Sequence, residues 1–135
     1  MEFTWLSRWQ PQLLALLRIV AALLFLEHST QKFLAFPAPF PAPGPLPPVE
    51  VAAGIIEGLT GILVTIGLFT RPIAFLAAGE MAIGYFMMHF PKSFWPAVNM
   101  GEAAILYCFI FLYIAAAGPG AWALDNLRMR NAPIR

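Results

Sequence analysis

Residues 49–69 read VEVAAGIIEGLTGILVTIGLF, an apolar run long enough to cross a lipid bilayer. A transmembrane helix needs about 20 mostly apolar residues, within a range of about 17 to 25. Four runs of the chain meet this requirement, and the predicted spans are Leu13–Phe36, Val49–Phe69, Ile73–Phe90 and Met100–Ala117. We therefore predict an all-α membrane protein, a single domain over residues 1–135 that forms an antiparallel bundle of four transmembrane helices in the lipid bilayer.

The composition supports a membrane environment. Hydrophobic residues make up 60% of the chain and charged residues only 11%, whereas soluble domains are about half apolar and a quarter charged. The net charge of +1 offers no basic surface, so nucleic acid is not an expected partner. Cys108 is the single cysteine, which excludes an intramolecular disulfide and any motif built on paired cysteines.

The segments between the spans indicate how the chain is oriented. Residues 37–48 contain seven prolines in twelve positions, too few N–H donors to continue a helix, and Thr70-Arg71-Pro72 reads as a tight turn. Basic residues concentrate on the cytoplasmic side of membrane proteins. One side of the predicted topology holds only Lys32 and Lys92, and the other holds Arg8, Arg71, Arg128, Arg130 and Arg135. We expect a multi-pass inner-membrane protein with both termini cytoplasmic and the proline-rich loop outside.

Each predicted span contains at least one glutamate, and the informative ones are Glu27, Glu57, Glu80 and Glu102. An acidic residue at mid-bilayer costs about 2.5–3.5 kcal/mol on insertion scales, so these side chains are expected to point into the bundle, protonated or paired. In the second span, Glu50, Gly54, Glu57 and Gly61 repeat at helical spacing and form one stripe. Small residues on such a stripe let helices approach closely, and the predicted packing positions are Gly54, Gly58, Gly61 and Gly84.

The candidate site is a polar pocket open to the outer face. Its predicted members are Glu27, His28, Lys32, Glu57, Glu80, Asn99 and Glu102, with Glu57 and Glu80 as the floor and His28 and Lys32 above them. A second interpretation stays open, in which each group is satisfied separately and only fixes helix register. No Glu-x-x-His motif occurs, so no metal site is predicted. Arg18 has a simple interpretation as a side chain that extends to the cytoplasmic interface.

Three blocks of the chain resemble the DoxX family of small bacterial membrane proteins. They are Arg18 with Lys32 in the first span, residues 57–63 (EGLTGIL) leading to 67–71 (GLFTR), and residues 99–102 (NMGE) followed by 118–120 (GPG) and Leu124-Asp125. The resemblance runs from about Arg18 to Asp125 and implies a four-helix membrane bundle. The family is named after a small subunit of a thiosulfate:quinone oxidoreductase. The chain departs from the expected pattern at Glu27-His28, at Ala123 and in its proline-rich first loop.

The function expected from these features is that of a membrane component of a redox or electron-transfer system. It would interact with a quinone or dock a catalytic protein partner, as a monomer or an oligomer. The chain offers no recognisable cofactor site of its own, so electrons would reach it from that partner. The catalytic residues, if any, are not identified. Two alternatives stay open: a non-enzymatic accessory subunit of a larger membrane complex, and a small-molecule or ion transporter.

Overall fold

The structure is a computed structural model that describes residues 4–131, a range that is all-helical and contains no strands. Its body consists of α2 (Gln10–Leu34), α3 (Pro48–Ile66), α4 (Thr70–Gly84) and α6 (Glu102–Ala117). The helical stretches 10–34, 48–66 and 70–92 are long and apolar enough to cross a membrane, and α6 is a shorter apolar helix. The predicted fold class, a helical membrane bundle of four helices, is confirmed. Arg135, used above for orientation, lies outside the described residues.

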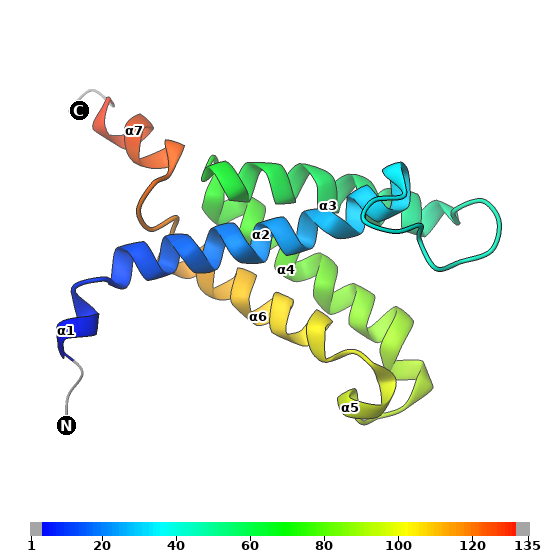
Figure 1. Ribbon diagram of the computed structural model, residues 1–135. Helices are drawn as coiled ribbons and strands as arrows, with labels where there is room; N and C mark the ends of the chain where they lie inside the picture. Colours follow the sequence, from blue (N-terminus) through cyan, green and yellow to red (C-terminus); the bar gives the residue numbers. More distant parts are fainter. Residues whose placement is uncertain (1–3, 132–135) are drawn as a thin grey trace.

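The four helices pack as two pairs, α2 with α3 and α4 with α6, and the pairs cross each other (Figure 1). Alanines dominate the core where the pairs meet, which lets the helix backbones approach closely. Phe25 of α2 and Phe111 of α6 connect the pairs, with their ring centroids 5.0 Å apart in an edge-on arrangement. The buried core residues are Ala21, Ala22, Phe25, Val64, Ala74, Ala77, Ala78, Phe111 and Ile114.

The bundle has two distinct ends. Two short helices, α1 (Thr4–Ser7) and α7 (Leu124–Arg130), lie at one end. We call it the arginine end because Arg18 and Arg71 bind backbone carbonyl groups there. The proline-rich loop between α2 and α3 lies at the opposite end, the proline end (Figure 1). At the proline end, α4 continues through a π-helical turn, η1 (Tyr85–His89), and a 3-10 turn, η2 (Phe90–Lys92). The four-residue α5 (Pro96–Asn99) then leads into α6.

The observed bounds differ from the predicted spans where the backbone turns left-handed. α2 ends at Leu34 because Ala35 has φ of +53°, and α3 ends at Ile66 because Gly67 has φ of +71°. The predicted turn at Thr70–Pro72 is wrong, since Thr70 begins α4 and Pro72 lies in its first turn. Proline is tolerated there because the first N–H groups of a helix have no partner within the helix.

Candidate functional site

Lys32 is the centre of a buried polar network at the proline end. Its Nζ lies 2.8 and 2.7 Å from the two carboxylate oxygens of Glu57, and 3.2 Å from Oε2 of Glu50. The Lys32 and Glu57 side chains are each only 6% exposed, and that of Glu50 is 16% exposed. One ammonium group therefore holds two carboxylates from the neighbouring helix, inside the protein.

Gly54 allows this arrangement. A Cβ atom at Gly54 would lie 2.7 Å from the Phe33 ring and 3.1 Å from Cδ of Lys32. The absence of a side chain on α3 thus makes the room in which Lys32 extends along that helix to Glu57. The residue that the sequence marks as a packing position also shapes the polar network.

Glu80 on α4 is the third carboxyl of this region. Both of its carboxyl oxygens are buried, and neither has a hydrogen-bond partner among the described residues. The charges of Glu57, Lys32 and Glu50 all act on it. A buried carboxylate without a partner is strongly unfavourable. Glu80 is therefore the carboxyl group of this region that needs either a bound proton or a ligand to balance its charge.

Glu27 and His28 do not join the network, contrary to the prediction. Both side chains are exposed on the outside of α2. The His28 ring meets Tyr107 of α6 edge-on, with centroids 6.3 Å apart. The helical spacing explains the difference for Glu27, which points away from the face of α2 that carries Phe25, Ser29 and Lys32. His28, one turn before Lys32, lies at the edge of that face, beside Tyr107 and exposed.

Asn99 and Glu102 also lie apart from the network. Asn99 is buried, but its amide organises the chain at the proline end: it donates to the Ser93 carbonyl at 2.9 Å and to the Tyr85 hydroxyl at 3.2 Å, and accepts from the Gly101 N–H at 2.7 Å. Glu102 is exposed at the first residue of α6. Of the predicted pocket members, direct contacts join Lys32 and Glu57, with Glu50 as an additional member, while Glu80 is buried without a hydrogen-bond partner among the described residues.

Three of the four predicted packing glycines lie against α2. A Cβ at Gly58 would lie 2.7 Å from Oγ of Ser29, and one at Gly61 would lie 2.8 Å from Cβ of Leu26; Gly54 is described above. Gly84 is different, because a Cβ there would have nothing within 4 Å. The prediction for Gly84 is wrong, since the chain turns from α-helix to the π-helical turn at this point and leaves its surroundings open.

Arg18 is the most important polar residue whose role the sequence did not reveal. It is fully buried, and its guanidinium group binds carbonyl groups inside the protein. Its Nη1 donates to the Val64 and Thr65 carbonyls at 2.7 and 2.6 Å. Its other nitrogens donate to three carbonyls of the segment after α6, those of Pro119, Ala121 and Trp122. Arg18 therefore caps the end of α3 and fixes the returning chain.

Arg71 and Asp125 complete the arginine end. Arg71 donates to the last carbonyls of α6, at Ala115, Ala116 and Ala117. The Asp125 carboxylate accepts from the N–H groups of Phe69 and Thr70, at 2.9 and 2.8 Å, where α4 begins. Burial acts to raise the pKa of Asp125, but these N–H donors and the charge of Arg128 outweigh it, and its pKa lies below the ordinary value. Charged groups thus satisfy three helix ends.

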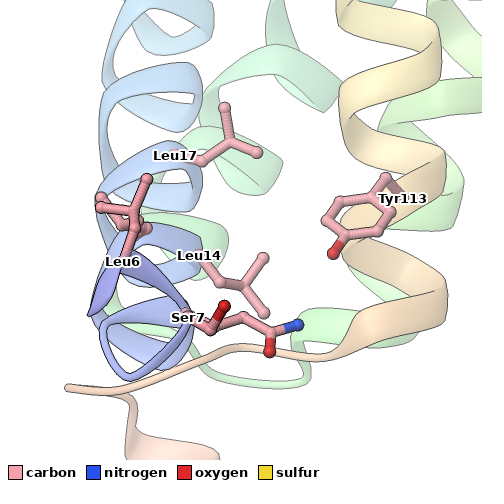
Figure 2. A pocket seen from close by; sticks show the side chains of 7 residues that line it. Leu6, Ser7, Leu14, Leu17 and Tyr113 are labelled. Carbon is pink, nitrogen blue, oxygen red and sulfur yellow. The ribbon is translucent and has the colours of Figure 1, made fainter. Parts of the chain in front are cut away.

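Two open hollows lie at opposite ends of the bundle. The hollow at the proline end, about 500 Å³, is lined by residues 31–35 of α2 and its C-terminal end and by residues of the proline-rich loop, and it includes Lys32. The other, about 540 Å³, lies between the start of α2 and α6 near Tyr113 (Figure 2). Its lining is mainly leucine with Ser7 and Gln10, and it contains none of the network residues. Within residues 4–131, no group of three His, Cys, Asp or Glu side chains is placed to hold a metal ion.

Comparison with known proteins places the chain in a family. The DoxX family model matches residues 13–90, which include Arg18, the Lys32–Glu57 pair and Glu80. The chain belongs to the DoxX family. This DoxX protein is 44% identical over 126 residues to an uncharacterized protein from Haemophilus influenzae, covering 90% of the chain and 94% of the relative.

A second relative of the DoxX protein is the inner membrane protein YphA of Escherichia coli. The two are 30% identical over 135 residues, covering 87% of the chain and 91% of YphA. No solved structure matches the chain. The family model covers the three helical stretches 10–34, 48–66 and 70–92 almost completely, so the network around Lys32 lies within the matched region.

Proposed function

We propose that this DoxX protein is the membrane subunit of a bacterial inner-membrane redox system, and that its proline end exchanges protons with a quinone. The observation that carries the proposal is the Lys32 network beside the unpartnered carboxyl of Glu80. Intramembrane ionisable groups without a structural partner mark proton and substrate pathways more often than packing.

The charges of the network favour a proton-binding role for Glu80. Lys32 supplies one positive charge, and Glu50 and Glu57 supply two negative charges. An ionised Glu80 would add a third negative charge without a hydrogen-bond donor, so we expect it to hold a proton in this state. A carboxyl in that condition is suited to deliver its proton to an acceptor and to take another from the network.

The hollow at the proline end offers a route between the network and the surface. Lys32 lines this hollow while its ammonium group contacts Glu57, and its Nζ lies 5.7 Å from the centre of the Phe40 ring. Protons from the surface would therefore reach Glu57 beside Lys32 and then Glu80. The asymmetry of the basic residues supports an orientation with the proline end outside.

A quinone suits both the surroundings and the chemistry. Its reduction to the quinol takes up two electrons and two protons, and its binding requires an apolar slot with a few polar groups. The network would supply the protons, and a catalytic protein partner would supply the electrons through its own cofactor. In this role the chain needs no cofactor beyond the quinone.

A non-enzymatic accessory subunit is the second candidate. It is favoured by the way Glu50 and Glu57 are satisfied by Lys32 without any ligand, which is what a purely stabilising network requires. The two candidates differ in what they expect of Glu80. An accessory subunit has no use for an unpartnered carboxyl, whereas a quinone subunit depends on it.

Photoaffinity labelling with an azido-quinone in native membranes tests the proposal. We expect labelled peptides from α2 and the second half of α4 in the wild type, and several-fold less labelling in Glu80→Leu. Glu102→Leu is the matched control, since it removes an exposed carboxyl at the same end. Glu80→Gln should keep the labelling, because an amide can donate a hydrogen bond, but should lower quinone reduction by the native membranes. Equal labelling of Glu80→Leu and the wild type would contradict quinone binding and favour the accessory subunit.

A further inference from the structure

The outer face of α2 carries polar side chains where lipid is expected. Glu27 and His28 are both exposed, and within residues 4–131 neither side chain makes a hydrogen bond or an ion pair. Glu27 lies seven residues, about 10 Å, from the end of α2. Leu24 on one side and Leu34 on the other are 46% and 72% exposed, so the polar pair lies within an apolar surface. A carboxyl group in contact with lipid is costly at this depth.

The exposed face has the spacing of a helix–helix contact. Exposed or half-exposed residues follow one another at alternating steps of four and three: Leu13, Leu17, Val20, Leu24, Glu27, Gln31 and Leu34. This alternation is the 3.5-residue repeat of a left-handed helix pair. The stripe runs for about 32 Å, close to the full thickness of the hydrocarbon layer. Leucines facing lipid need no partner, but Glu27 and Gln31, toward the proline end of the stripe, do.

We propose that this face, the α2 stripe together with His28, is covered by a second copy of the chain. Successive helical residues point about 100° apart, so Glu27 and His28 diverge on either side of a line that leads out of α2. A two-fold axis along the membrane normal, crossing that line, places Glu27 of one copy opposite His28 of the other, and the reverse. The imidazole N–H of each copy then donates to the carboxylate of its neighbour.

Further features of the chain are compatible with a contact between two copies of α2. The two-fold axis keeps both protomers in the same orientation in the membrane, as a single chain topology requires. Gln31, one helical turn from Glu27, offers a second N–H donor to the same carboxylate. A polar layer in an apolar seam also fixes the register of two helices. The proposal concerns the contact of α2 with a second copy and does not rest on the proposed quinone site.

Cysteine cross-linking in native membranes tests the interface, in a Cys108→Ser background. We expect oxidation to give a covalent dimer for Leu24→Cys, on the stripe. Leu59→Cys is the matched control: it is 59% exposed on α3 at similar depth, and should stay monomeric. No dimer at Leu24, or an equal yield at Leu59, would overturn the proposal.

Exchange of the two polar residues distinguishes a second copy from another protein. Glu27→His puts two histidines together and His28→Glu puts two carboxylates together, so each should raise the dimer dissociation constant in detergent about tenfold. The double variant Glu27→His/His28→Glu restores acid opposite imidazole and should return the constant to near the wild-type value. If both single variants weaken association and the double variant does not recover it, Glu27 and His28 do not pair across the interface and the proposal fails. Sedimentation equilibrium measures the constant.

Discussion

Lys32 of α2 places its ammonium group between both carboxylate oxygens of Glu57 of α3, at 2.8 and 2.7 Å, with both side chains nearly fully buried. A buried charge that loses its partner destabilises a protein by about 3–5 kcal/mol. We expect Lys32→Met to lower the free energy of unfolding by about this amount, because two carboxylates remain without their cation.

The double variant Lys32→Met/Glu57→Leu should lose less stability than the two single variants lose together. Each single substitution leaves a buried charge without its partner, and the second substitution removes that charge. Glu102→Leu serves as the control, because that side chain is exposed. Unfolding in mixed detergent micelles, followed by fluorescence, gives these free energies. Additive effects of the two substitutions would show that the pair does not couple α2 and α3.

The glycines of α3 and α4 provide a matched pair of substitutions. A Cβ at Gly61 would meet Cβ of Leu26 at 2.8 Å and its Cα at 3.1 Å, whereas a Cβ at Gly84 would meet nothing within 4 Å. Gly61→Ala should therefore destabilise the bundle by about 1–3 kcal/mol through overpacking. Gly84→Ala should be neutral or stabilising, because alanine favours the helix by up to about 1 kcal/mol. Equal effects in thermal denaturation would contradict the close contact of α2 with α3.

Helical periodicity predicted the buried face well for the second span, α3, and poorly for the fourth span, α6. In α3 the stripe through Gly54, Glu57 and Gly61 is buried as expected. The residues of α6 are apolar on every side of the helix, so its sequence contains no amphipathic pattern that would indicate which face is buried. Glu102 was expected to point into the bundle, but it is exposed and the buried residues of α6 are Phe111 and Ile114.

The hydrogen-bond partners of Arg18 could not be predicted from helical periodicity. Its partners are carbonyl groups at the end of α3 and in the segment 119–122, which is remote in sequence. Carbonyl groups leave no trace in a sequence, so a buried arginine bound by them resembles one that reaches the membrane interface. The glycines at 118 and 120 were the available signal, since both have positive φ and bring the chain back beneath α2.

Asp125 predicts a specific pH dependence of stability. Hydrogen bonds from Phe69 and Thr70 lower its pKa in the folded protein, so folding favours the carboxylate. Its contribution is complete above about pH 5 and is lost as the pH falls through the ordinary value near 3.9 towards the lowered one. Asp125→Asn should therefore be less stable than the wild type at pH 7, by about 1 kcal/mol as for other helix caps. The difference in stability between the variant and the wild type should shrink at pH 3. Thermal denaturation in mild detergent measures this difference. If it is the same at pH 3 and pH 7, the Asp125 carboxylate does not stabilise the start of α4 in this way.

The orientation of the bundle predicts which residues an impermeant thiol reagent reaches. In a Cys108→Ser background, Ala42→Cys in the proline-rich loop should react from outside intact cells. Asn131→Cys, after α7, should react only once the membrane is opened. The basic residues near α1 and α7 are the physical reason. The reverse pattern of labelling would place the proline end in the cytoplasm and remove the proposed route for protons.

The proposed proton exchange requires that Glu80 hold an exchangeable proton beside the Lys32 network. Infrared spectroscopy of the purified protein at pH 7 tests it most directly, because a protonated carboxyl has a carbonyl stretch that a carboxylate lacks. We predict such a band in the wild type, a shift of the band in heavy water, its loss in Glu80→Gln and its retention in Glu102→Gln. A wild-type spectrum without the band, or a band that persists unchanged in Glu80→Gln, would contradict the account.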